Sequence, residues 1–191
     1  KRVANNINSL LGGDIHEIVP TVPYTSEDIN YRNPSCRANI EQNDPTILPE
    51  ISGEIKNFNE YTTVFIGYPI WGGKAPNIIR TFMKKYDFTN KNIITFSTSA
   101  SSSDSSKSFL KDLAPNAKWD DQFKRFSSSV AKSLVKTWLV DLNVQTSILV
   151  VYFSATGNTR NVANYIKNAN LADIKEIQPV VPYTKEDIDY T

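Results

Sequence analysis

The sequence is poor in three residue types that build reactive, cross-linked or metal-binding sites. Its 191 residues include one cysteine, one methionine and one histidine. A single cysteine excludes an intrachain disulfide and suits a reducing compartment, so we expect a cytoplasmic protein. His16 lacks a set of Cys, Asp or Glu residues at ligand spacing, which indicates a surface residue. Cys36 has no evident base partner, which indicates an ordinary, partly buried thiol.

The sequence also lacks strong net charge and long apolar runs. The formal net charge is +1, which gives no reason to expect a nucleic-acid partner. No apolar run approaches the ~20 residues that a membrane-spanning helix needs, so no membrane partner is expected. Hydrophobic residues still make up 40% of the chain, which is typical of a globular protein. The length suffices for one domain of about 150 residues with a substantial core.

A short apolar run at residues 148–153 has the strongest pattern in the chain. It reads Ile-Leu-Val-Val-Tyr-Phe, which is typical of a parallel strand buried on both faces. A hydroxyl-rich turn from Ser154 to Thr159 follows directly, and then a helical pattern. The helix start offers unpaired amide groups and the positive end of its dipole, and Gly157 permits close backbone approach. This order predicts a phosphate site. The alternative is that the turn only caps the helix, and the absence of lysine makes a triphosphate P-loop a poor match.

The chain contains an internal repeat. Residues 1–31 align without gaps to residues 160–190, with 17 identical positions out of 31. We infer two tandem homologous modules. Residues 1–143 form one module that lacks its first strand and phosphate loop. Residues 148–191 supply the first strand, phosphate loop, first helix and second strand of the repeated module.

Strands and helices alternate along the rest of the chain, which predicts an α/β fold with a parallel sheet. The predicted strands are Asp14–Val19, Val64–Tyr68, Ile93–Phe96 and Ala117–Trp119, the last resumed at Phe123–Phe126. The predicted helices are Val3–Leu11, ended by Gly12 and Gly13; Cys36–Gln42, capped by Ser35; Ile78–Tyr86; Phe109–Leu113; and Val130–Leu142, capped within Ser127–Ser129.

A second candidate site follows the strand at Val64–Tyr68. Trp71 lies just beyond the strand end and offers a flat apolar face beside Gly72 and Gly73. Ligands of parallel α/β sheets bind beyond the carboxyl ends of the strands, so we interpret Trp71 as a platform for a planar ring. The alternative is a core or interface aromatic. The acidic pair Glu27–Asp28 follows Thr25 and is interpreted as a turn or helix-start feature.

Several stretches together resemble small flavodoxins. They are Phe65–Phe82, Ile148–Arg160 and the two Val-Pro-Tyr-Thr blocks at 22–25 and 181–184. The resemblance implies a three-layer, doubly wound sheet of five parallel strands in the order 2-1-3-4-5, with FMN at the switch point. Residues 148–153 would supply the central strand, in cis or by swapping in a domain-swapped oligomer. The helix near Val162 would then dock, and residues 1–11 would be displaced.

The resemblance also implies the binding residues, with no catalytic residue and no metal ligand. The FMN phosphate would be held by Ser154, Ala155, Thr156, Gly157, Asn158 and Thr159. The flavin ring would stack on Trp71, with Pro69, Ile70, Gly72 and Gly73 along its edge and Thr98 and Ser99 on its other side.

Three functions follow from the resemblance. The first is an electron-transfer flavodoxin working with separate reductase and acceptor proteins, and we favour it slightly over an enzyme because no catalytic acid is obvious. The second is an FMN-dependent NAD(P)H reductase of quinones or nitro compounds. The third is a flavin-free structural or interaction module, suggested by serines where glycines are expected after Ser99. If the Gly72–Gly73 peptide reorients toward the reduced flavin, replacing Gly72 with valine should shift the flavin potential.

Overall fold

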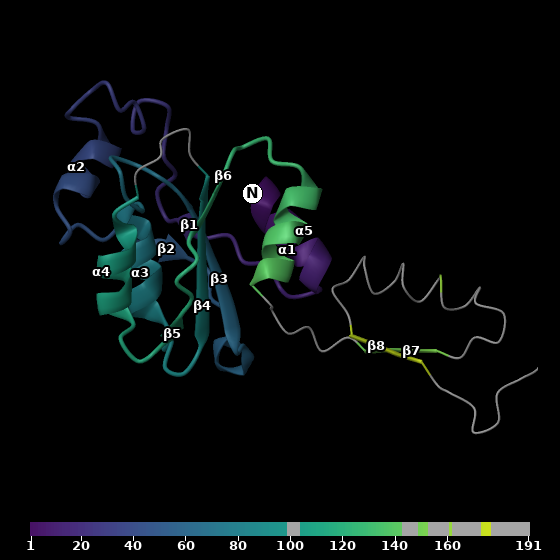
Figure 1. Ribbon diagram of the computed structural model, residues 1–191. Helices are drawn as coiled ribbons and strands as arrows, with labels where there is room; N and C mark the ends of the chain where they lie inside the picture. The colour runs from purple at the N-terminus through teal and green to yellow at the C-terminus, as the bar shows by residue number, and fades with distance from the viewer. Residues whose placement is uncertain (99–103, 143–148, 153–160, 162–172, 177–191) are drawn as a thin grey trace, which may run out of the picture. The chain divides into compact units, whose positions relative to one another are not determined.

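The computed structural model describes residues 1–98, 104–142, 149–152, 161 and 173–176 (Figure 1). They divide into two compact units. One unit is His16–Val130, and the other combines Lys1–Ile15 with Ala131–Thr191. No helix among these residues has the length and apolar character needed to cross a bilayer.

A parallel sheet forms the centre of the unit His16–Val130. Its strands are β3 (Thr63–Pro69), β4 (Asn92–Thr98), β5 (Lys118–Trp119) and β6 (Lys124–Phe126). β3 and β4 pair along their whole length, and β5 and β6 both pair with β4, all in parallel. The predicted strands of this sheet are confirmed, including the interrupted last one. The five residues from Ile93 to Ser97 are all buried, as expected for a strand with neighbours on both sides.

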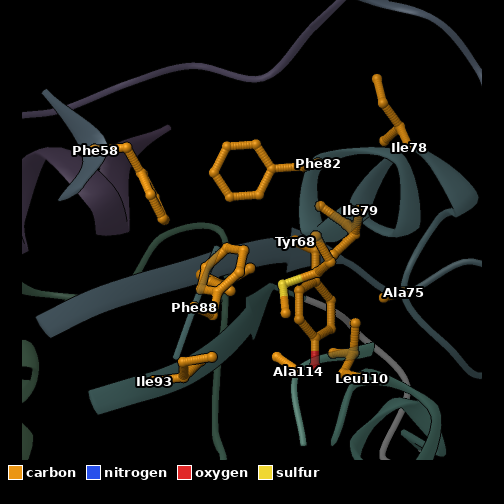
Figure 2. Packing of buried hydrophobic residues seen from close by; sticks show 12 residues of the cluster. Phe58, Tyr68, Ala75, Ile78, Ile79, Phe82, Phe88, Ile93, Leu110 and Ala114 are labelled. Atoms are coloured by element: carbon orange, nitrogen blue, oxygen red, sulfur yellow. The ribbon is translucent and has the colours of Figure 1, made fainter. Parts of the chain in front are cut away.

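Two helices cover one face of this sheet, α3 (Asn77–Lys85) and α4 (Ser106–Leu113) (Figure 1). Apolar residues recur along one side of α3, and Ile79, Phe82 and Met83 are at most 5% exposed. Figure 2 shows the core that they share with the sheet. It contains aromatic pairs, such as Phe58 and Phe88, whose ring centroids lie 5.0 Å apart in an edge-to-face arrangement.

A small polar region precedes the sheet in this unit. It holds β1 (Val19–Pro20), α2 (Arg37–Asn43), β2 (Ile51–Ser52) and the short 3-10 helix η1 (Phe58–Glu60). β1 and β2 pair in antiparallel fashion. The predicted short helix is confirmed, but the N-cap residue is Cys36 and makes no side-chain capping bond, so the prediction of Ser35 as the cap is wrong.

The predicted strand at Asp14–Val19 is also wrong over most of its length. Only Val19 belongs to a strand, and residues 12–17 are exposed. The repeated copy at 173–176 differs from residues 14–17 only by lysine in place of His16, and it forms strand β8 (Asp173–Glu176). β8 lies alongside β7 (Leu149–Tyr152), whereas residues 14–17 take part in none of the strand pairs of the described residues. Near-identical sequences therefore differ in structure because only one has a neighbouring strand.

The other unit contains two packed helices, α1 (Arg2–Leu11) and α5 (Lys132–Asp141). The α1 helix ends at Gly12, whose φ of 71° is the predicted glycine cap. Val3 and Ile7 are at most 5% exposed, because the apolar side of α1 meets that of α5. α1 therefore packs on α5, and the displacement of residues 1–11 from the sheet stays a prediction. The α5 helix begins later than predicted, after the N-cap residue Ala131.

The proposed central strand forms, and its neighbour is known on one side. β7 pairs in parallel with β8, from Leu149 opposite Asp173 to Tyr152 opposite Glu176. In the order 2-1-3-4-5 the neighbour on one side would be the predicted strand Asp14–Val19, but its repeated copy, β8, pairs with β7 instead. Pairing of β7 with β3 is not among the strand pairs of the described residues, so insertion beside β3 stays a prediction.

Candidate functional site

The turn after β3 has the geometry that two glycines allow. The Trp71 N–H donates to the Lys74 carbonyl at 2.9 Å, and the Lys74 N–H donates to the Trp71 carbonyl at 3.1 Å. Gly72 and Gly73 have φ values of 53° and 79°. Positive φ at both central positions defines a type I′ turn, which residues with a Cβ adopt only with strain. A Cβ added to Gly72 would meet no atom within 4 Å, so the space above the turn is open.

The Trp71 side chain is partly exposed on this turn. The Tyr24 ring approaches it edge-to-face, with centroids 5.2 Å apart and an interplanar angle of 82°. Pro69, the last residue of β3, is exposed, and Thr98 lies opposite it at the end of β4. An indole, a proline and open space over glycine fit one face and one edge of a planar aromatic ligand.

The α2 helix contacts both the turn and Tyr24. The Gln42 Nε2 donates to the Trp71 carbonyl at 2.7 Å and to the Ala75 carbonyl at 3.3 Å. The Tyr24 hydroxyl donates to the Glu41 carboxylate at 2.5 Å. Burial, and then the hydrogen bond to Glu41 and its negative charge, raise the pKa of the Tyr24 hydroxyl, while Arg37 opposes the shift. Tyr24 therefore stays a neutral donor at ordinary pH.

The segment that begins α4 holds the other side of the turn. The Ser105 N–H and hydroxyl donate to the Gly73 carbonyl at 2.9 and 3.2 Å. The Ala75 N–H donates to the Ser106 Oγ at 2.6 Å, and the Ser106 hydroxyl donates to Asp104. The Tyr68 hydroxyl also donates to Asp104 at 3.2 Å. Burial, and then the negative charge of Asp104, raise the pKa of the Tyr68 hydroxyl. The turn is thus fixed from two directions.

The structure places the predicted ring-binding residues together where it describes them. They are Pro69, Ile70, Trp71, Gly72 and Gly73, with Thr98 at the neighbouring strand end. Ser99 and the predicted phosphate loop, Ser154, Ala155, Thr156, Gly157, Asn158 and Thr159, lie outside the described residues.

The structure describes the surroundings of Cys36, His16 and the Thr25–Asp28 turn. Cys36 is a free thiol and 4% exposed, and His16 is exposed. The part of the chain that the structure describes holds no group of three or more His, Cys, Asp or Glu side chains suited to a metal ion. Asp28 accepts the Thr25 N–H while its own N–H donates to the Thr25 hydroxyl, which is a capping-box arrangement. The Thr25 N–H and hydroxyl both donate to the Asp28 carboxylate, and these two bonds lower the pKa of Asp28.

The sequence pattern did not indicate the residues that surround Trp71. Tyr24 lies in a polar, turn-rich stretch, and Glu41 and Gln42 lie in the predicted short helix, with Gln42 29 residues from Trp71 in the chain. The one available signal was the Pro-Tyr-Thr block, which the repeat retains at 23–25 and 182–184. Ser105 and Ser106 lie in a run of serines, and no pattern in it distinguishes the two that bind the turn.

Comparisons with known proteins agree with this geometry. The flavodoxin family model matches residues 1–142 and again residues 147–191. A candidate flavoprotein from Bacteroides eggerthii DSM 20697 has a similar structure, with a TM-score of 0.68 and 35% sequence identity over 75% of this chain and 90% of that chain. A candidate flavoprotein from Bacteroides uniformis ATCC 8492 gives a TM-score of 0.67 and 32% identity over 73% and 88%. No curated protein sequence matches significantly. With both matches together spanning nearly all of its residues, the chain belongs to the flavodoxin family.

Proposed function

We propose that this protein binds FMN without a covalent bond and carries electrons between separate reductase and acceptor proteins. The observation that supports the proposal is the partly exposed Trp71 on a Gly-Gly turn at the carboxyl end of β3. A flavin ring needs a flat apolar face and close backbone approach, and this turn offers both. Bound FMN would supply the electron chemistry, while the protein holds the ring and tunes its potential.

The residues of the turn would contact the flavin ring, and other residues would contact the phosphate. Trp71 would stack on the ring, with Pro69 and the two glycines along its edge and Thr98 nearby on β4. We assign the phosphate to the hydroxyl-rich turn 154–159, on the sequence pattern given above. That turn directly follows β7, so both halves serve one ligand only if β7 joins the sheet of β3.

We therefore propose the strand order β8-β7-β3-β4-β5. The pair β8-β7 supplies the 2-1 part of the family order and β3-β4-β5 supplies the 3-4-5 part, and all pairs are parallel. The exposure of β3 supports a further neighbour, because Gly67 and Pro69 are exposed in it, whereas Ile93–Ser97 of β4 are all buried. β7 would come from the same chain or from a second copy in a domain-swapped oligomer.

Titrations with FMN and riboflavin test the proposal, because the two flavins differ only by the phosphate. Trp71→Leu should weaken binding of both flavins about 10- to 100-fold, since aromatic stacking contributes about 1–3 kcal/mol. Thr156→Val should weaken FMN binding about five- to tenfold and leave riboflavin unchanged, because it removes one hydrogen bond to the phosphate. Quenching of flavin fluorescence gives both dissociation constants.

Thr62→Val, at an exposed threonine, is the matched control and should change neither constant. Failure of the unaltered chain to bind either flavin would contradict the proposal and favour a flavin-free module. If FMN binding responds to only one of the two substitutions, the two halves do not form one site. Steady NAD(P)H consumption by the FMN-loaded protein would favour the reductase instead.

The turn geometry also sharpens the hypothesis about the Gly72–Gly73 peptide. Turning this peptide over converts a type I′ turn into type II′, in which φ stays positive at Gly72 and becomes negative at Gly73. Substitution of Gly72 is therefore strained in both forms, so the turn geometry does not support the shift in potential expected above for Gly72→Val. Gly73→Ala disfavours only the form seen here, by about 1 kcal/mol. If the reduced flavin prefers the turned peptide, Gly73→Ala should raise the one-electron potential by about 40 mV.

Spectroelectrochemical titration of the FMN complex measures this shift. Gly72→Ala is the matched control, because it should weaken the turn without changing the potential. Equal potentials for the Gly73→Ala variant and the unaltered protein would reject a redox-linked turn of this peptide.

A further inference from the structure

The α2 helix reaches Trp71 by two separate routes. Gln42 binds the Trp71 backbone, and Glu41 binds the Tyr24 hydroxyl, whose ring lies against the indole. Glu41 and Gln42 are each 5% exposed, which is unusual for such side chains unless they are fully hydrogen-bonded. Gln42 thus contacts the backbone of Trp71, and the neighbouring Glu41 contacts the Trp71 side chain through Tyr24.

Each route continues to further partners that limit its freedom. The Gln42 Oε1 accepts the Asn77 N–H at 3.2 Å, which fixes the rotation of the amide. Arg37 donates to Glu41 at 2.7 Å and lies 4.1 Å over the Tyr24 ring, and it also donates to the Val22 carbonyl at 2.9 Å. Tyr24 is therefore held by its hydroxyl, its ring face and its neighbouring backbone.

The helix itself is fastened to the core of the sheet unit. A seven-residue helix is marginal on its own, and α2 has no side-chain N-cap bond. The Asn77 Nδ2 donates to the carbonyls of Glu41 and Asp44, which lie at the end of α2. Asn77 begins α3, which packs into the core, so α2 transmits the position of α3 to the Trp71 turn.

We propose that Tyr24 and Gln42 are positioning residues that orient Trp71 for a planar aromatic ligand. This inference rests on the proposed flavin site, and it adds residues outside the strand-end loops. The hydrogen bonds of the turn also show which of its peptide groups can still rotate. Trp71, Gly73 and Ala75 all have backbone groups bound by α2 or α4, whereas the Gly72 carbonyl and the Gly73 N–H make no hydrogen bond to the described residues. The two residues thus fix the indole while one glycine peptide can still rotate.

Two variants and their matched controls test the inference in the full chain. Gln42→Leu removes the bond to Trp71 at similar volume, and Tyr24→Leu removes the ring that contacts the indole. The controls are Gln122→Leu and Tyr31→Leu, at exposed positions, the latter 77% exposed. The first measurement is the ¹⁵N indole signal of Trp71 in flavin-free protein, which Trp71→Phe identifies among the three tryptophans. The second is the dissociation constant for riboflavin.

We expect both variants to shift and broaden the Trp71 indole signal and to weaken riboflavin binding about tenfold, the effect of losing one well-placed contact. The controls should change the binding less than twofold. Tyr24→Phe, which keeps the ring and loses the hydroxyl bond to Glu41, should lie between Tyr24→Leu and the unaltered chain. A structural role alone would lower stability without this graded order.

The inference and the proposed function fail in different ways. An unchanged Trp71 signal in both leucine variants overturns the positioning role, whether or not flavin binds. Absence of flavin binding by the unaltered chain overturns the proposed function, while the indole signal still decides the orientation of Trp71. If Gln42→Leu does not fold, Tyr24→Leu decides alone, because Tyr24 is only partly buried.

Discussion

Replacing Asn77 with aspartate is expected to lower the free energy of unfolding by about 3 kcal/mol or more. Asn77 is 2% exposed, and its Nδ2 donates to the carbonyls of Glu41, Asp44 and Ile47 at 2.5, 2.8 and 2.9 Å. Aspartate has the same shape but places a carboxylate oxygen against these three carbonyl oxygens. The buried carboxylate therefore loses its hydration and is repelled by the three carbonyls. The helix dipole at the start of α3 favours the carboxylate by only ~1 kcal/mol.

Urea unfolding at pH 7 measures the loss, with Asn116→Asp at an exposed position as the control. Burial raises the pKa of the new carboxyl in the folded state above its unfolded value of about 4. The destabilisation is therefore complete above the folded-state pKa and decreases as the pH falls toward 4. A stability within 1 kcal/mol of the unaltered protein at pH 7, on the order of one weak hydrogen bond, would show that Asn77 does not hold α2.

Replacing Gly67 with alanine is expected to destabilise the protein by about 1–3 kcal/mol, as overpacked cores do. A Cβ at Gly67 would lie 2.2, 2.5 and 2.8 Å from carbons of the Phe96 ring. Phe96 is the residue opposite Gly67 on β4 and is 5% exposed, so its ring covers the glycine and cannot easily move away. The absence of a side chain at Gly67 is therefore required by the neighbouring strand.

A double-mutant cycle with Phe96→Leu identifies the cause. Gly67→Ala should cost at least about 1 kcal/mol less when residue 96 is leucine, because the clash is with the ring. Gly13→Ala is the control, since a Cβ there would meet nothing within 4 Å. Equal costs of Gly67→Ala in the two backgrounds would mean that the Phe96 ring is not the obstacle.

The sequence predicted those elements whose pattern is complete within a short window. The apolar runs of β3 and β4 and the apolar stripe of α3 are confirmed. Burial of a strand on both faces requires a continuous apolar run, and burial of one helix face requires apolar residues three or four positions apart. The predicted N-caps of α2 and α5 are wrong. Nearby serines fit the preference of N-cap positions for a hydroxyl side chain, but the two helices start at other residues.

The candidate site could be predicted only where its residues follow a strand end. Trp71, Gly72 and Gly73 lie just beyond β3, at the edge where ligands of parallel α/β sheets bind, so topology alone was enough to predict their place. Tyr24 and Gln42 reach Trp71 through contacts between distant parts of the chain, and no local period reports such contacts. Their burial and hydrogen bonds appear only once α2 has been placed against the turn.

The two copies of the Asp-Ile-x-Glu segment, residues 14–17 and 173–176, are expected to tolerate substitutions to different degrees. Ile15 and His16 are exposed and take no part in strand pairing among the described residues, so most substitutions at these two positions should be nearly neutral for stability. The copy in β8 has to keep a backbone that matches β7. Two stretches with nearly the same sequence are thus expected to differ in how much stability a substitution costs, with the larger loss in β8.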